Sequence, residues 1–263
     1  MKNNAGAIKF IIIFILILFL VSNFTSCHSD FFNLFNNKIM VGDFNVLGRK
    51  YEFTDGTAYE VRLENIAFEN FTGEVTLNDT LRNELIITTD DNIFSSLSVK
   101  KDDENGIITI SGNTDYKYSP SEFGIEIGKN VENIKIDGTY DIDLIYSSIN
   151  NLTIELNGAV SGSVTCDFAD TVTLKTGGAT EAALSGRAKK LTVTAEGVSK
   201  ISGFKMSADA VEVNAAGSST AEVTANAELA VEITGEAKVY YRGAPVITKR
   251  EIFGLGELIS AAE

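Results

Sequence analysis

The sequence feature that most constrains the fold is a repeated strand-like pattern in the second half of the chain. An aliphatic, a polar and a second aliphatic residue recur in six copies, which begin at Ile134, Leu152, Val172, Leu191, Val211 and Val231. Their starting points are 18, 20, 19, 20 and 20 residues apart. This alternation is typical of a β-strand with one buried face. Its constant spacing predicts a solenoid, in which each unit buries its inner face by stacking on its neighbours.

A turn of glycine or other small residues follows each copy, as at Asn157-Gly158 and Gly177-Gly178. Twenty extended residues trace about 66 Å, enough for a closed coil around a narrow core but not for a helix-strand unit with its return. We therefore predict an all-β, single-stranded right-handed parallel β-helix with rungs of about twenty residues. Its interior is expected to hold an aliphatic ladder of Leu152, Val172, Leu191, Val211 and Val231. An antiparallel meander or sandwich is the alternative, but it does not require a constant spacing.

The preceding region, residues 46–130, contains strand-like runs without this period. We interpret it as irregular N-terminal coils and a cap, because an open solenoid end exposes unpaired strand edges. Residues 131–263 are then the regular rungs and a C-terminal cap. Since the composition does not change between the two parts, residues 46–263 are predicted to form one β-helix domain, with a separate small β domain as the alternative.

The N-terminus has the layout of a secretory signal. Lys2 and Lys9 precede an apolar stretch from Phe10 to Val21, which as a helix would reach about 18 Å, short of the roughly 30 Å hydrocarbon core. The following Phe24-Thr25-Ser26-Cys27 resembles the lipobox of bacterial lipoproteins, although Phe24 stands where that pattern usually has an aliphatic residue. We predict a signal helix within residues 1–27 and lipid attachment at Cys27. A plain secretory signal and an uncleaved anchor are the alternatives.

Residues 28–45 are predicted to be a tether. Phe31, Phe32, Phe35 and Ile39-Met40 make it partly apolar, so it is expected to pack on the domain rather than on the bilayer. The remaining cysteine, Cys166, has no intramolecular partner once Cys27 is lipidated, and we interpret it as a small buried hydrophobe.

Charge and motif content exclude several functions. The formal net charge is -14, with 36 acidic against 22 basic residues, so nucleic acid is not an expected partner. His28 is the sole histidine and lies beside the processing site, which excludes histidine-based triads and multi-histidine metal sites within this chain. Gly177-Gly178 ends a strand without opening a helix, so it is not interpreted as a phosphate loop. We predict no catalytic, cofactor or metal residues and a protein that is not an enzyme.

Three groups of residues are candidate sites. Asp137, Asp141 and Asp143 surround one turn, and Asp90-Asp91 lie in a turn upstream. Closely set carboxylates can bind a metal or act as acid and base, but we favour solvated turn carboxylates. Tyr240-Tyr241-Arg242 is compatible with a sugar or peptide platform, and the favoured interpretation is a cap on the terminal coil.

A family resemblance adds to these patterns. The stretch Leu229–Pro245, followed by Gly254-Leu-Gly256, resembles the C-terminal signature of the auto-transporter adhesin head GIN domain family. Asn65–Phe68, Thr88–Ile93 and Gly106–Ile110 lie in the order that the family leads one to expect, over roughly residues 55–260. The family's Gly-Ser-Gly turns are altered here. The resemblance implies a β-helical envelope domain, often on lipoproteins, and supplies no catalytic residues.

These observations predict a non-enzymatic cell-envelope lipoprotein, exported and membrane-anchored at the outer membrane, cell surface or periplasm. Its expected partners are the membrane, through the N-terminal lipid, and an envelope polysaccharide or protein bound in an adhesin-like manner. Two alternatives stay open. One is a β-helical carbohydrate-active lyase or hydrolase that uses Asp137, Asp141 and Asp143. The other is a structural or regulatory envelope protein that pairs through a coil end.

Overall fold

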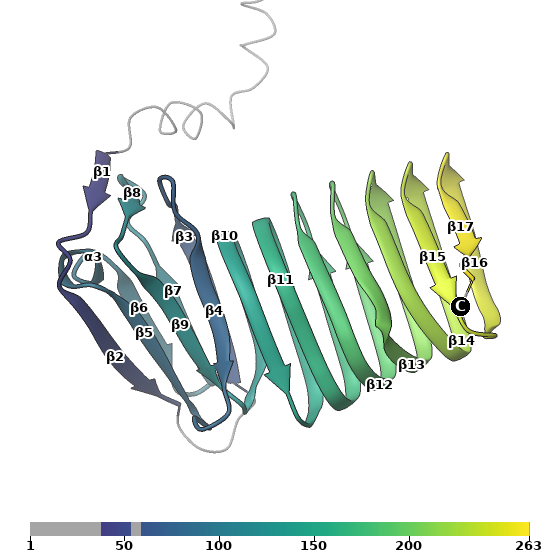
Figure 1. Ribbon diagram of the computed structural model, residues 1–263, viewed down its shortest axis with the longest axis horizontal. Coiled ribbons are helices and arrows are strands. Elements are labelled where there is room, and N and C mark those ends of the chain that lie inside the picture. Colours follow the sequence, from purple (N-terminus) through teal and green to yellow (C-terminus); the bar gives the residue numbers. More distant parts are fainter. Residues whose placement is uncertain (1–37, 54–58, 263) are drawn as a thin grey trace, which may run out of the picture. The chain divides into compact units, whose positions relative to one another are not determined.

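The computed structural model of this protein describes residues 38–53 and 59–262. Strands make up most of them and form a β-solenoid, so the predicted parallel β-helix is confirmed (Figure 1). Within the described part of the chain, the single α-helix is the four-residue α3 (Asp91–Phe94). The predicted signal helix, Cys27 and His28 lie outside the described residues.

The second half of the chain consists of successive coils that pair in parallel. The strands are β10 (Val131–Tyr146), β11 (Ile149–Thr176), β12 (Glu181–Ala195), β13 (Lys200–Gly217), β14 (Thr220–Gly235), β15 (Lys238–Arg242), β16 (Val246–Gly254) and β17 (Glu257–Ser260). The strands from β10 to β14 pair each with the next, and β14 and β15 then pair with β16 and β17. In these strands buried and exposed residues largely alternate, which places one side of every coil in a shared core.

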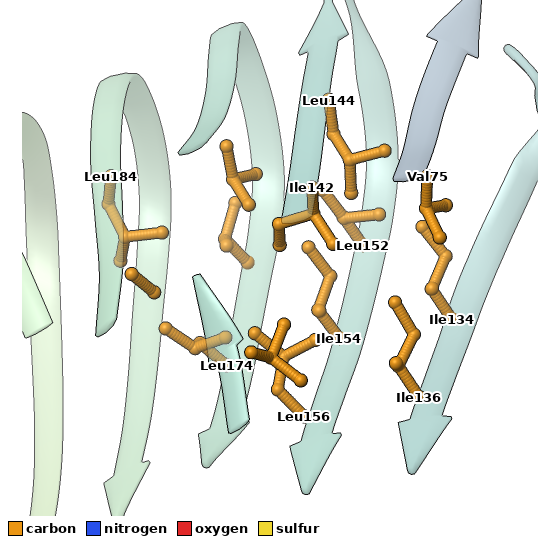
Figure 2. Packing of buried hydrophobic residues seen from close by; sticks show 14 of the residues in the cluster. Val75, Ile134, Ile136, Ile142, Leu144, Leu152, Ile154, Leu156, Leu174 and Leu184 are labelled. Carbon is orange, nitrogen blue, oxygen red and sulfur yellow. The ribbon is translucent and has the colours of Figure 1, made fainter. Parts of the chain in front are cut away.

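The aliphatic ladder is confirmed in its middle and wrong at one end. Val172, Leu191 and Val211 are register partners and are all buried. The next member is Leu229 and not Val231, because Val211 pairs with Leu229 while Val231 pairs with Val213. In the same way, Ile134 lies beside Ile154 and not beside Leu152, as Figure 2 shows. The prediction therefore slipped by two residues at both ends of the repeat.

A bulge in β13 explains the slip at the C-terminal end. Gly203 pairs with Val223 and Ser207 with the adjacent Thr224, so residues 204–206 leave the ladder on the β13 side. Ala208 then pairs with Ala225 and Ala210 with Glu228, which returns one residue on the β14 side and leaves a net shift of two. The coil from Val211 to its register partner Leu229 is therefore shorter than the predicted rung of about twenty residues. A slip of two residues keeps every side chain on its original face, since strand side chains alternate with a period of two.

The predicted turns form a column of glycines down one corner of the solenoid. Each member lies beside its counterpart in the next coil and has a positive φ: Gly138, Gly158, Gly178, Gly197, Gly217, Gly235 and Gly254. Amide groups of each coil bond to the glycine carbonyls of the previous one, as in Val198 N–H to Gly178 O at 2.9 Å. A Cβ atom on Gly178 would lie 2.6 Å from Gly158 O, so this corner requires glycine.

The first coils do not follow the order of the chain. The coil of β3 (Tyr59–Ile66) and β4 (Gly73–Asn78) pairs directly with β10. The coil of β7 (Ile107–Ser111) and β9 (Phe123–Gly128), although later in sequence, lies on the far side of β3 and β4. The coil formed by β3 and β4 is therefore held between two coils that come later in the chain.

Antiparallel strands close this end of the solenoid. β2 (Val46–Glu52) pairs with β5 (Glu84–Asp90), which pairs with β9, and β6 (Ser98–Asp102) pairs with β7. Helix α3 adds the buried Ile93 and Phe94, and the short β1 (Lys38–Val41) pairs with β8 (Tyr116–Ser119). In Figure 1 this cap lies at one end of the solenoid, and β16 and β17 lie at the other.

Candidate functional site

A row of polar side chains crosses the outer side of the first coils. Register places Glu126, Thr76, Asp143 and Ser163 side by side, and Glu74, Asp141 and Ser161 in a parallel row. The buried residues between them, such as Val75 and Ile142, point into the core. We call the outer side of β9, β4, β10 and the adjoining part of β11 the acidic face, after its four carboxylates, those of Glu74, Glu126, Asp141 and Asp143.

Hydroxyl groups from the next coil bind two of these carboxylates. Ser161 Oγ donates to Asp141, and Ser163 Oγ donates to Asp143 Oδ1 at 2.7 Å. One coil further, Thr165 and Ser185 share a hydrogen bond of 2.8 Å. These bonds fix the direction of the carboxylates while leaving Asp141 and Asp143 exposed to solvent.

A groove of about 390 Å³ lies at one edge of the acidic face. Its lining residues are Leu77, Asn78, Asp79, Glu126, Ile145 and Ser147. Asn78 Nδ2 donates to Glu126 Oε2 at 2.6 Å, and Ile145 contributes an apolar wall with 55% of its surface exposed. The groove thus combines two carboxylates, an amide and a hydroxyl with one apolar side, a set of groups that suits a hydroxyl-rich ligand.

The three candidate aspartates do not converge. Asp141 and Asp143 lie on the acidic face, whereas Asp137 pairs with Asn157 beside the glycine corner. None of the three lines the groove. In the described part of the chain, no group of three or more histidine, cysteine or acidic side chains is placed to hold a metal ion. The geometry supports the interpretation of these three as solvated carboxylates.

Asp90 contradicts the prediction of a solvated turn carboxylate, because its side chain is fully buried. It accepts hydrogen bonds from Phe44 N–H and from the N–H and hydroxyl of Ser121, each 2.7 Å long. Burial tends to raise the pKa of this carboxyl, but the bonds from Ser121 and Phe44 outweigh it and hold the pKa below its ordinary value. Its neighbour Asp91 is partly exposed and pairs with Arg49 at 3.3 Å.

The predicted capping role of Tyr240-Tyr241-Arg242 is wrong in its position. These residues belong to β15, and the coil of β16 and β17 lies beyond them. Tyr241 packs against the core, while the Arg242 guanidinium lies 4.1 Å from the Phe204 ring centroid and donates to Ala262 O at 3.0 Å. The segment therefore links the last coils to one another through contacts of partly exposed side chains.

Cys166 is a fully buried core residue, as predicted. Burial, with a smaller contribution from Asp167, raises the pKa of its thiol to about 12. A thiol that stays protonated and buried is a poor nucleophile at neutral pH, so the side chain acts as a small hydrophobe.

The last coil exposes apolar side chains and strand edges. Among the described residues, β16 pairs only with β14 and β17 only with β15. Val246, Phe253 and Leu255 are more than half exposed. Arg250 occupies the register position of the buried Val231 and so stands at an inward position of this open coil.

The groove was missed by reasoning from sequence. Asn78, Asp79 and Ile145 belong to no motif that the sequence singles out. The groove arises because β4 pairs with β10, about 65 residues later, and no local pattern reports that pairing.

Comparison with known proteins identifies relatives of this chain and of its fold. A family model described as "Putative auto-transporter adhesin, head GIN domain" matches residues 66–245. No curated protein matches the sequence. In the part of the chain that the structure describes, none of the helices has the length and apolar character needed to cross a membrane.

Several solved structures share the fold. A "putative adhesin" from Bacteroides fragilis superposes with a TM-score of 0.72 at 18% identity, covering 84% of this chain and 100% of its own. A "putative lipid binding protein" from Parabacteroides distasonis gives 0.59 at 21% identity, covering 86% and 100%. A "putative adhesin" from the same species gives 0.59 at 16% identity, covering 85% and 100%. At these identities the likeness establishes the β-solenoid fold alone.

Proposed function

Because this chain belongs to the auto-transporter adhesin head GIN domain family, we propose that its β-solenoid is a non-enzymatic binding module of the bacterial cell envelope. Family and fold relatives described as adhesins support a partner at the cell surface. The proposed partner is an uncharged, hydroxyl-rich envelope polysaccharide that lies on the acidic face.

The observation that carries this proposal is the continuity of the groove with the ordered carboxylates. Glu126 lines the groove, and register places it in the same row as Asp143, whose carboxylate is oriented by Ser163. A row of fixed acceptors matches a chain of sugar hydroxyls, each of which can donate a hydrogen bond. Ile145 offers an apolar contact to the face of a ring. Polyanionic glycans are disfavoured by the net charge of -14.

Anchoring is the second part of the proposal. Residues 1–27 act as the signal peptide and Cys27 receives the lipid. The tether predicted at residues 28–45 is shortened to the part before β1, because Lys38–Val41 pair with β8 and belong to the binding domain. The charged and apolar layout of the N-terminus and the lipobox-like Phe24–Cys27 support it. Metabolic labelling with a fatty-acid analogue tests it, since Cys27→Ala should abolish the label and unchanged labelling refutes lipidation there.

An array of glycans and envelope components, probed with the full chain, tests the partner. The double variant Asp141→Asn with Asp143→Asn, and separately Glu126→Gln, should each weaken binding to the recognised neutral glycan by about tenfold, the effect of losing about 1.4 kcal/mol. The matched control is Glu196→Gln with Asp209→Asn, which removes the same charge from exposed positions outside the acidic face. Equal binding by both double variants, or degradation of any glycan by purified protein, contradicts the proposal.

A second candidate function is favoured by the open terminal coil. The unpaired edges of β16 and β17 and the exposed Val246, Phe253 and Leu255 suit an envelope protein that pairs through this end. The inward position of Arg250 opposes simple stacking of a further coil, so such a partner has to supply an acidic group there. The enzyme alternative has no comparable support, because Asp137 lies apart from Asp141 and Asp143.

A further inference from the structure

Exposed apolar side chains gather at the capped end of the solenoid. Of the twelve strongly exposed large hydrophobic residues in the described part of the chain, five lie between positions 39 and 47. We define four of these as the N-terminal apolar surface, Ile39, Val41, Phe44 and Val46. The fifth, Leu47, follows Val46 in β2 and points to the opposite face of that strand. A group of this size near one segment is more than the scattered apolar residues that any soluble surface carries.

The most exposed member of this surface is rigidly presented. Phe44 has 80% of its surface exposed and a φ of +62°, a conformation that is costly for an aromatic residue. Its N–H is held by the buried Asp90 at 2.7 Å, and the following Asn45 donates from its N–H to Asp43 Oδ1 at 3.0 Å. The positive φ and these two hydrogen bonds therefore fix a turn that keeps the Phe44 ring exposed to solvent.

Further bonds fix the segment on either side of Phe44. Asn92 Nδ2 donates to Val41 O at 2.7 Å, and Asp43 N–H donates to Asn92 Oδ1 at 3.2 Å. After the turn, Asp91 N–H donates to Asn45 O at 3.0 Å, and Val46 begins β2 by pairing with Asp90. Polar side chains of the cap thus bind the backbone of this segment. Met40 packs against the core, while Ile39, Val41 and Phe44 are each more than half exposed.

We propose that the N-terminal apolar surface rests on the lipid bilayer and sets the orientation of the solenoid relative to the membrane. This inference depends on the proposed lipid at Cys27. Ten residues separate Cys27 from Lys38, so the chain between them spans at most about 40 Å. A lipid held in the membrane keeps this surface within that reach of the bilayer at all times, which raises the effective concentration of the two for each other.

The opposite end of the solenoid lies too far away to make the same contact. From β7 to β16 the coils make eight steps of about 4.8 Å, or roughly 38 Å, with the cap on the near side; seven join paired strands and one lies within β11, where Gly178 stacks on Gly158. When the N-terminal apolar surface lies on the bilayer, the terminal coil of β16 and β17 points away from it. The terminal coil then stands clear of the membrane, whereas the acidic face lies on the coils next to the cap.

The chain contains no tryptophan, so a single introduced one reports on a chosen position. Phe44→Trp tests the surface, and Phe253→Trp, at the exposed terminal coil, is the matched control. Full-length protein made in a lipid-modifying bacterium is reconstituted into phosphatidylethanolamine and phosphatidylglycerol vesicles, with or without brominated acyl chains. We expect brominated lipid to quench the Phe44→Trp emission at least twofold and to leave the Phe253→Trp emission unchanged.

Equal quenching at the two positions overturns the inference. A shift of the Phe44→Trp emission that follows protein concentration in the absence of vesicles also overturns it, because the occupant is then a second copy of the chain. Acyl labelling of the same preparations separates this inference from the proposed anchor. Labelled protein without selective quenching refutes membrane contact by the N-terminal apolar surface and leaves the proposed lipid anchor intact. Selective quenching in unlabelled protein refutes the lipid anchor alone.

Discussion

Ser121 donates two hydrogen bonds of 2.7 Å to Asp90, one from its N–H to Oδ2 and one from its hydroxyl to Oδ1. A third bond to the same carboxylate comes from Phe44 N–H. Three segments that are far apart in sequence therefore meet on one buried charge. This single side chain connects the start of the described chain to the cap and to the coil of β7 and β9.

Replacing Asp90 should destabilise the N-terminal cap. Charge-assisted hydrogen bonds contribute about 1.5–3 kcal/mol each and are not additive, so we expect Asp90→Ala to lower the free energy of unfolding by about 3–5 kcal/mol. Asp91→Ala, which removes only a half-exposed ion pair to Arg49, should cost less than about 1 kcal/mol. Urea unfolding measures both, and similar losses for the two variants would contradict the role of Asp90.

The same carboxylate should make the fold sensitive to acid. Its pKa is lower in the folded protein than in the unfolded chain, where the pKa of an aspartate is about 3.9. Its contribution to stability is therefore fully present above that value and is lost as the pH falls through the folded pKa. We expect Asp90→Asn to show a smaller loss of stability between about pH 4 and pH 2 than the parent, in thermal melts across that range.

The glycine column should tolerate no side chain. Gly178→Ala places a Cβ atom 2.6 Å from Gly158 O at a φ of +76°, so we expect a loss of about 2–4 kcal/mol in the free energy of unfolding. Gly124→Ala is the control, because nothing lies within 4 Å of its added Cβ and its backbone is unstrained. That variant should change stability by less than about 0.5 kcal/mol. Comparable losses in chemical unfolding would show that the column is not required.

Arg250 should keep the terminal coil from stacking on other molecules. Its inward position puts a charge where the preceding coil has the buried Val231, a device by which sheet proteins protect their edges. We expect Arg250→Val to self-associate at concentrations about tenfold or more below any association of the parent, an effect of about 1.4 kcal/mol. Lys249→Val removes the same charge from the adjacent, outward position. Sedimentation velocity measures the self-association of both variants, and equal association of the two would exclude this role of Arg250.

The Cys166 thiol should be unreactive in the folded protein. Its side chain is buried and its pKa is raised to about 12, so little thiolate is accessible at pH 8. We expect a thiol reagent to label Cys166 in denaturant within minutes and in native buffer at least about a hundredfold more slowly, with peptide mapping to identify the site. Fast native labelling of Cys166 would show that the core opens around it.

Sequence reasoning recovered the features that repeat and missed those that depend on distant partners. The glycine column and the alternation around Val172 and Leu191 were predictable, because each recurs every coil. The register of Val231 was not, since the similar tripeptides Val211-Glu-Val213 and Val231-Glu-Ile233 align well although the bulge at 204–206 displaces them. A two-residue slip leaves the inside and outside of the strand unchanged, so hydrophobic pattern alone cannot detect it.

The candidate site depended even more on long-range pairing. Asp90 looked like any turn aspartate until Ser121 and Phe44 were seen to enclose it. The groove beside Ile145 exists because the coil of β3 and β4 lies between two other coils, that of β7 and β9 on one side and that of β10 on the other. This spatial order differs from the order along the chain, and coils of similar length give no sign of the difference in the sequence. The architecture, the lack of a catalytic motif and the family resemblance follow from the sequence, whereas the positions of Asp79 and Glu126 depend on the pairing of distant strands.

The parallel register of the coils also governs how the molecule would yield under load. Hydrogen bonds between neighbouring coils run along the solenoid axis, so tension between the cap and the terminal coil pulls on them lengthwise, a few at a time. Each coil that peels away releases about twenty residues, or roughly 66 Å of extended chain. A module tethered at one end and gripped at the other would lengthen in steps, dissipating a sudden pull before the cap itself has to bear it.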